Sequence, residues 1–202
     1  MTEAQRVLKR ETFIKAEMDK RLSLAQSNVL WQKATEKLSA ILEEYADLPK
    51  GVRAHTDTYI FPSAAIYLTL KEAVGAETAY DIVETAAIGL TNRYGKKLAG
   101  LMKLPGMPAL FVSVFDPICR KRFGPGNGFQ NVFYPKEKGV YRMDVLACPY
   151  TRYFGELGCF ELTKVFCEND DRVYGNLPGL KFERHTTIGK GGEKCDFCVK
   201  RM

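Results

Sequence analysis

The chain has 202 residues, of which 46% are hydrophobic and 27% charged, a composition typical of a globular protein. That length suits one domain, or one domain with a helical appendage. The net charge of +6 is mildly basic. There is a small basic cluster, Arg120-Lys121-Arg122, but no long basic run and no zinc-finger spacing, so we expect no nucleic-acid partner.

The first 21 residues carry charges every few positions and lack the apolar stretch of a secretory signal. No window approaches the roughly 18 apolar residues that a membrane span needs. We therefore predict a cytoplasmic protein without a membrane partner. In that compartment the six cysteines are expected to be thiols, metal ligands or catalytic groups, not a disulfide framework.

The first 123 residues read as helical. Residues 4–46 contain neither proline nor glycine, and their apolar residues recur at roughly helical spacing, with a break near Ser23–Ser27 that predicts two helices. Pro62 favours a helix that begins just after it. Pro117 should bend or interrupt the last helix. The helices predicted after residue 46 are Ser63–Val74, Glu77–Arg93 and Ala109–Arg122.

The hydrophobic period changes after the glycine-rich loop Gly124–Gly128. Residues 129–134 and 140–147 read as a β-hairpin, because apolar and polar residues alternate in them. Two helices and two further strands follow. We predict an α+β fold: a helical region over residues 1–123, then an antiparallel ββααββ unit over residues 124–202, together forming one compact domain. The later predicted elements are helices over 150–156 and 160–171 and strands over 180–188 and 194–201.

Cys148 lies where the second predicted strand ends and a helix begins at Pro149. A thiol at a helix N-terminus is close to exposed N–H groups and the positive end of the helix dipole, and both favour the thiolate. The sequence therefore makes Cys148 a candidate nucleophile. The alternative is that it is a small buried hydrophobic residue, as most cysteines are.

Cys195 and Cys198 form a C-x-x-C pair, which can hold zinc or act as a redox pair. The pair falls on a predicted strand, where an odd spacing puts the two side chains on opposite faces. That placement argues against a shared site. Four thiolates from Cys148, Cys167, Cys195 and Cys198 remain an alternative zinc site; otherwise no cofactor is expected.

The helix before residue 171 places Cys167 and Asp170 three positions apart, on one face, where the carboxylate could act as a general base or orient the thiol. Arg184 and Thr186 alternate on a predicted strand and could bind a substrate carboxylate. His55, before a loop that leads into the helix after Pro62, could act near neutral pH, although a lone histidine is more often a satisfied polar residue.

Three segments resemble the L-2-amino-thiazoline-4-carboxylic acid hydrolase family: Ala147-Cys148-Pro149-Tyr150, Glu156–Leu162 and Phe166–Asp170. The ending with Arg184, Thr186, Gly191 and Cys195-Asp196-Phe197 is similar as well. The likeness covers about residues 128–198 and continues more weakly upstream, at His55 and Pro62–Tyr67. Phe160, His185 and Cys198 depart from the family's usual residues. The last hairpin is also similar to four-vinyl-reductase-like ligand-binding domains.

The resemblance implies a hydrolase that opens a small cyclic C=N compound such as 2-amino-thiazoline-4-carboxylate to N-carbamoyl-cysteine. The family's recurrent positions fall on Cys148, Cys167, Asp170, Arg184, Thr186, Cys195 and Asp196. With the weaker upstream likeness at His55, we predict Cys148, Asp170 and Cys195 as catalytic residues, and Arg184, Thr186, His55 and Cys167 as substrate-binding residues. Two other hypotheses remain open: a non-catalytic small-molecule or zinc-binding domain, and a homo-oligomer paired through the N-terminal helices.

Overall fold

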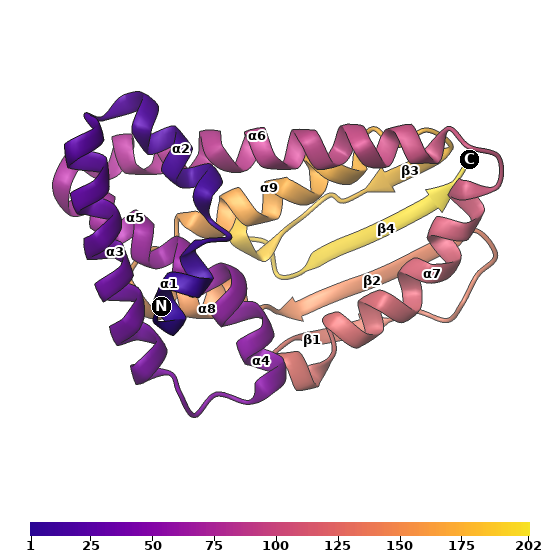
Figure 1. Ribbon diagram of the computed structural model, residues 1–202. Coiled ribbons are helices and arrows are strands. Elements are labelled where there is room, and N and C mark those ends of the chain that lie inside the picture. The colour runs from indigo at the N-terminus through magenta and orange to yellow at the C-terminus, as the bar shows by residue number, and fades with distance from the viewer. The chain divides into compact units, whose positions relative to one another are not determined.

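The computed structural model describes residues 1–202, and the chain divides into two compact units. Unit 1 comprises residues 1–90 and 152–162, and unit 2 comprises residues 91–151 and 163–202. The predicted α+β class is confirmed, since many helices accompany one four-stranded antiparallel sheet. All four strands belong to unit 2, which begins well before the sequence pattern changes at residue 124 (Figure 1).

Unit 1 is built from helices, and its first segment is divided more finely than its sequence predicts. The predicted break near Ser23 is present, but a second break at residues 9–11 separates two shorter helices. Ser23 caps the longest of these helices by accepting a hydrogen bond from the Gln26 N–H, 3.2 Å away. The first three helices are α1 (Glu3–Leu8), α2 (Thr12–Arg21) and α3 (Leu24–Glu44).

The helix around Pro62 begins earlier than its sequence predicts. Helix α4 (Lys50–His55) continues through a π-helical turn, Thr56–Ile60, directly into α5 (Phe61–Val74). A proline inside a helix lacks an N–H and crowds the carbonyl four residues before it. The wider π-helical turn, placed just before Pro62, relieves that conflict without ending the helix. His55 is therefore a helical residue and not part of a loop.

The segment 152–162 returns to unit 1 and packs there. The Phe154 side chain is fully buried, and the rings of Tyr153 and Phe61 meet edge to face. The Tyr67 hydroxyl donates to the Glu161 carboxylate at 2.5 Å, and the Lys71 ammonium donates to the same oxygen at 2.9 Å. These polar contacts hold segment 152–162 against α5.

Unit 2 begins within the long helix α6 (Ala76–Met102), which continues past its predicted end at Arg93 and through Gly95 and Gly100. A Cβ at Gly95 would lie 3.0 Å from the Arg172 carbonyl oxygen, so this glycine permits close helix packing instead of ending the helix. Helix α7 (Met107–Arg122) continues without a break through Pro117, so the predicted interruption there is absent. No helix of the chain is long and apolar enough to cross a membrane.

The sheet and its two helices follow the predicted ββααββ order. The strands lie in the order β1-β2-β4-β3, and every neighbouring pair is antiparallel. The third strand is much shorter than predicted because the chain leaves the sheet at Arg184. The elements are β1 (Gln130–Phe133), β2 (Val140–Ala147), α8 (Pro149–Glu156), α9 (Leu162–Tyr174), β3 (Leu180–Glu183) and β4 (Cys195–Arg201).

One face of the sheet carries the core of unit 2. Tyr141, Met143 and Phe197 are buried there together with residues of α7, which lies in front of β1 and β2 in Figure 1. The ring of Phe197 contacts four other aromatic rings, those of Phe115, Tyr141, Tyr174 and Phe182.

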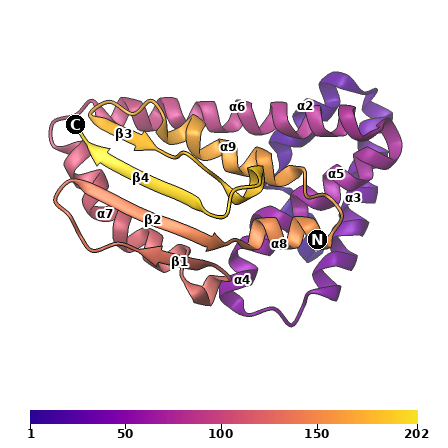
Figure 2. The same ribbon diagram turned by 180° about the vertical axis from the view of Figure 1, so that it is seen from behind.

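The opposite face of the sheet is charged. Lys194 binds the Asp144 carboxylate at 2.6 Å, and Lys200 binds Glu183 at 2.5 Å. No helix crosses in front of β2 and β4 in the reverse view of Figure 2. Strand alternation thus separates an apolar face from a polar one.

Phe197→Ala should lower the free energy of unfolding by about 3–5 kcal/mol, because it opens a cavity among four aromatic rings. Urea denaturation followed by circular dichroism measures the loss. Leu146→Ala is the control, since this β2 side chain is 49% exposed and should cost no more than about 0.5 kcal/mol. Equal losses in the two variants would mean that the core does not lie on the face that we describe.

Candidate functional site

Cys148 lies between β2 and α8, at the start of the helix. The Thr151 hydroxyl donates to the Cys148 carbonyl oxygen at 2.8 Å, which fixes the first turn. The backbone N–H groups of Tyr150 and Thr151 donate to the Cys148 sulfur. The expected setting of this thiol, at the N–H groups that begin a helix, is therefore present.

The acidity of Cys148 is the opposite of what its helix position suggests. Burial raises the pKa of the Cys148 thiol to about 12, and the hydrogen bonds from the two N–H groups only reduce that shift. Desolvation penalises the charged form, and here it outweighs the helix terminus. At neutral pH the side chain is a thiol, so a nucleophilic role requires that its proton be removed during the reaction.

Three thiols of unit 2, which we call the thiol cluster, are near enough for their charges to influence one another: Cys148, Cys167 on α9 and Cys195 at the start of β4. A negative charge on Cys167 or Cys195 would raise the pKa of Cys148 further, which reflects how near they are. Burial raises the pKa of Cys167 to about 11, and burial also raises that of Cys195. The Ile188 N–H donates to the Cys195 sulfur at 3.3 Å. The structure thus brings three of the predicted residues together.

The turn at residues 188–190 closes over the thiol cluster. This turn is a short 3-10 helix, not the hairpin turn that its glycines suggest. A Cβ at Gly189 would lie 2.8 Å from the Cys167 sulfur and 2.7 Å from the Thr163 Cγ2 atom. Only glycine allows the backbone to approach the thiol so closely.

Asp170 lies beside Cys167 and Cys195 and is paired with Arg184. The Arg184 guanidinium is 4% exposed and donates to Asp170 at 3.0 Å, to Asp171 at 2.5 Å and to the Cys167 carbonyl oxygen at 2.6 Å. Burial raises the pKa of Asp170 to about 6, and the Arg184 charge limits that rise. Arg184 is thus already occupied by two carboxylates.

Thr186 is not on a strand with Arg184, because both residues follow the end of β3. The Asp196 carboxylate accepts hydrogen bonds from the N–H groups of His185 and Thr186, at 2.9 and 2.7 Å. Burial would raise the pKa of Asp196, but these bonds and the His185 ring lower it below its usual value. Asp196 therefore holds the bend that turns Arg184 toward α9, and the role of Thr186 toward a substrate stays a prediction.

His55 is the last residue of α4, is buried, and lies with its ring centre 6.5 Å from that of Tyr59. It belongs to unit 1, whereas the other candidate residues belong to unit 2. Its part in substrate binding stays a prediction.

Cys198 lies on the charged face of the sheet, opposite Arg142 in the strand register, whereas Cys195 packs against the apolar core. The two residues are thus on opposite faces of β4, as their spacing predicts. A zinc site that used both thiolates would require β4 to be rebuilt. No group of three or more His, Cys, Asp or Glu side chains in residues 1–202 is arranged to hold a metal ion.

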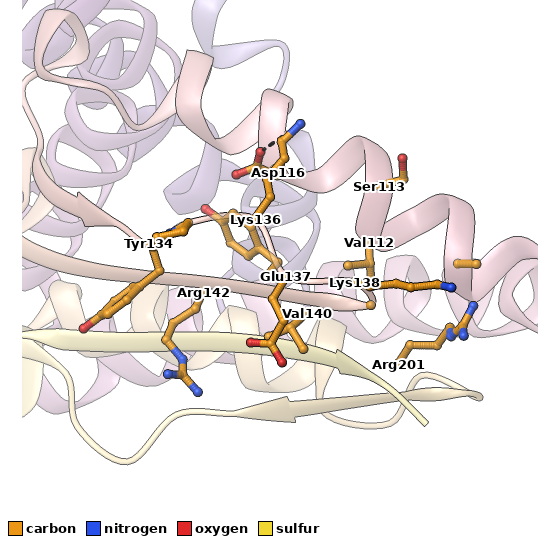
Figure 3. A pocket seen from close by; sticks show the side chains of 14 residues that line it. Val112, Ser113, Asp116, Tyr134, Lys136, Glu137, Lys138, Val140, Arg142 and Arg201 are labelled. Carbon is orange, nitrogen blue, oxygen red and sulfur yellow. Dashed lines mark ion pairs between the residues drawn. The ribbon is translucent and has the colours of Figure 1, made fainter.

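A pocket of about 400 Å³ lies between α7 and the β1–β2 hairpin (Figure 3). Asp116, Lys136, Lys138 and Arg201 are among the residues that line it, and none of the predicted site residues does. It is thus separate from the thiol cluster.

The sequence interpretation gave no site role to Asp171, which binds Arg184, or to Gly189, whose backbone closely approaches Cys167. Asp171 could have been found, because it adjoins Asp170 on a helix that ends near the thiols. No local signal distinguishes Gly189 from the glycines of an ordinary turn, since its function depends on how the turn packs against α9.

Gly189→Ala should lower the free energy of unfolding by about 1–3 kcal/mol, because the added methyl group overpacks the contact with Cys167 and Thr163. Adding Cys167→Ala should recover part of the loss, with a coupling energy of about 1 kcal/mol in a double-mutant cycle measured by urea denaturation. Gly126→Ala is the matched control, because a Cβ there meets nothing within 4 Å. Additive effects of the two substitutions would contradict the close approach.

Two comparisons with known proteins return nothing: no curated protein matches the chain, and no solved structure does. The third comparison succeeds. The family model described as L-2-amino-thiazoline-4-carboxylic acid hydrolase matches residues 53–199, which is more than half of the chain. The match includes every predicted site residue and the turn at Gly189, and the chain therefore belongs to the L-2-amino-thiazoline-4-carboxylic acid hydrolase family.

Proposed function

We propose that this protein is a hydrolase that opens a small cyclic C=N compound of the 2-amino-thiazoline-carboxylate type, with Cys148 as the nucleophile. Membership of a hydrolase family supports an enzymatic function. The observation that carries the proposal is the thiol cluster, in which Cys148 at a helix start is near enough to two other thiols for their charges to interact. A carboxylate, Asp170, adjoins two of the three thiols.

In the first step the Cys148 sulfur would bond to the ring carbon that lies between sulfur and nitrogen. The electrons of the C=N bond move to the nitrogen, which takes up the proton that the thiol releases. The ring C–S bond then breaks, and a proton from the amidinium goes to the departing sulfur. Water next adds to the carbon, the bond to Cys148 breaks, and the Cys148 sulfur regains a proton. The product is a carbamoylated amine with a free thiol.

Asp170 suits two needs of this reaction. The substrate's amidine gains positive charge when it is protonated, and a carboxylate beside it stabilises that charge. A carboxylate can also relay the proton that the thiol releases to the ring nitrogen. Both roles require the ionised form of Asp170, which Arg184 favours.

Arg184 and Thr186 are the proposed binding residues for the substrate carboxylate. Because Arg184 is nearly buried and binds two carboxylates, a substrate would have to take the place of one of them. Asp171 is the better one to displace, since its side chain is 47% exposed and Asp170 has a role in the reaction. The substrate carboxylate would then take the place of the Asp171 carboxylate, so the guanidinium would still be paired with two anions.

Cys148→Ala should lower kcat/KM by at least about a thousandfold, because the covalent step is lost. The value of kcat/KM is obtained by monitoring, with mass spectrometry, the formation of N-carbamoyl-cysteine from 2-amino-thiazoline-4-carboxylate. Cys159→Ala is the control: this thiol is also buried with its pKa raised to about 12, but it lies in unit 1. A Cys148→Ala protein with unchanged turnover would exclude the covalent mechanism.

The rate should depend on the ionisation of Asp170. Because the pKa of this carboxyl is raised toward about 6 and the ionised form is needed, kcat/KM should fall as the pH drops below about 6. Asp170→Asn should remove this limb of the pH–rate profile and lower kcat/KM by about a hundredfold or more. Asp171→Asn should retain the limb. A limb that persists in Asp170→Asn would assign it to another group.

A further inference from the structure

Helices α6 and α7 present an exposed apolar surface in unit 2. Six of the 14 large hydrophobic residues that are exposed in the whole chain lie between residues 94 and 118, each with 41–59% of its surface accessible. Leu110, Val114 and Ile118 are four residues apart and so share one side of α7. The others are Tyr94, Leu101 and Leu104.

Both helices pack against the same core, and Leu104 lies in the turn between them. Leu98, Ala99 and Met102 of α6 and Phe111, Val112 and Phe115 of α7 all pack into the core cluster that includes Tyr141 and Met143 of the sheet. Because both helices face the same core, their opposite sides both point away from the sheet. We call the outward residues of segment 94–121 the α6–α7 surface.

The same segment holds the excess positive charge of the protein. Residues 91–124 contain seven Lys and Arg residues and one acidic residue, Asp116, so their net charge of +6 equals that of the entire chain. The remaining 168 residues contain 23 basic and 23 acidic side chains and are neutral overall. Asp116 is already bound by Arg120, while Lys96, Lys97, Lys103 and Lys121 are exposed.

We propose that the α6–α7 surface docks the protein on an anionic lipid bilayer. Helices with exposed apolar residues among Lys and Arg lie in the membrane interface, with the apolar side chains at the acyl boundary and the cations at the headgroups. Lysine stems suit this position because their apolar carbons lie along the lipid while the ammonium stays in water. Such docking needs no membrane-spanning segment, so it departs from our expectation of no membrane partner, which rested on the lack of an apolar span.

Charge decides between a bilayer and the other partners of an apolar surface. A second copy paired through this surface would bring two segments of net charge +6 together, with one acidic residue on each side. Nucleic acid would neutralise the cations but would leave the leucine, valine and isoleucine side chains in contact with phosphates and water. An anionic bilayer accommodates both the apolar and the basic residues.

Vesicle co-sedimentation of the full chain tests the proposal. The protein should bind vesicles of phosphatidylcholine with about 30% phosphatidylserine and not phosphatidylcholine alone, because the cations require anionic headgroups. Raising the salt from about 0.1 M to about 0.5 M should weaken the binding, because the charges become screened.

Two sets of substitutions separate the apolar from the charged contribution. Leu110→Ser, Val114→Ser and Ile118→Ser combined should lower the partition coefficient by at least about tenfold. Lys103→Gln and Lys121→Gln should each lower it about fivefold. Leu24→Ser with Val29→Ser is the control, because these apolar residues are at least as exposed but lie in unit 1. Circular dichroism verifies that all variants are folded.

Three results would overturn the proposal: no binding that depends on phosphatidylserine, unchanged binding by the triple serine variant, or equal loss of binding in the control. Light scattering tests the main alternative, which is that two copies of the chain pair through this surface. If the protein is a dimer that the triple variant converts to a monomer, and it does not bind vesicles, the surface belongs to a second copy. None of these results bears on turnover, so the test is independent of the proposed hydrolase activity.

Discussion

The one-sided burial of the four-stranded sheet is the constraint on which unit 2 depends. Phe197 lies in the middle of β4 among four aromatic rings, and this packing fixes which face of the strand is apolar. Side chains alternate along a strand, so Cys195, two residues earlier, must face the same core, while Cys198 must face the charged side. The position of one ring thus decides which thiol can join Cys148 and Cys167.

Much of the fold could be predicted because it is encoded in local patterns. Alternating apolar residues identified β1, β2 and β4, and the order ββααββ followed from them. The errors arise where a distant contact overrides a local signal. Gly95 looks like a helix breaker but provides room for the Arg172 carbonyl, and β3 ends early because the Asp196 carboxylate binds two N–H groups that a longer strand would have used.

The positions of several candidate residues on their elements were predictable from the sequence, but their electrostatics were not. The spacing of Cys167 and Asp170 on a helix, and the place of Cys148 at a helix start, are sequence properties. The pKa of Cys148 is not, because it depends on burial by segments far away in the sequence, and burial reverses the effect of the helix terminus. Likewise, nothing near Arg184 in the sequence indicates that two aspartates 13 and 14 residues earlier already bind its guanidinium.

The π-helical turn at Thr56–Ile60 determines what a one-residue deletion in this helix would do. A π-helical turn holds about one residue more than an α-helical turn in the same continuous helix. Deleting one residue from it would restore regular α-helical hydrogen bonding, and the helix would remain unbroken. The side chains of α4 would, however, rotate by about 100° relative to those of α5, since one residue corresponds to that angle. His55 would leave its buried position, so the extra residue sets the direction in which this histidine points.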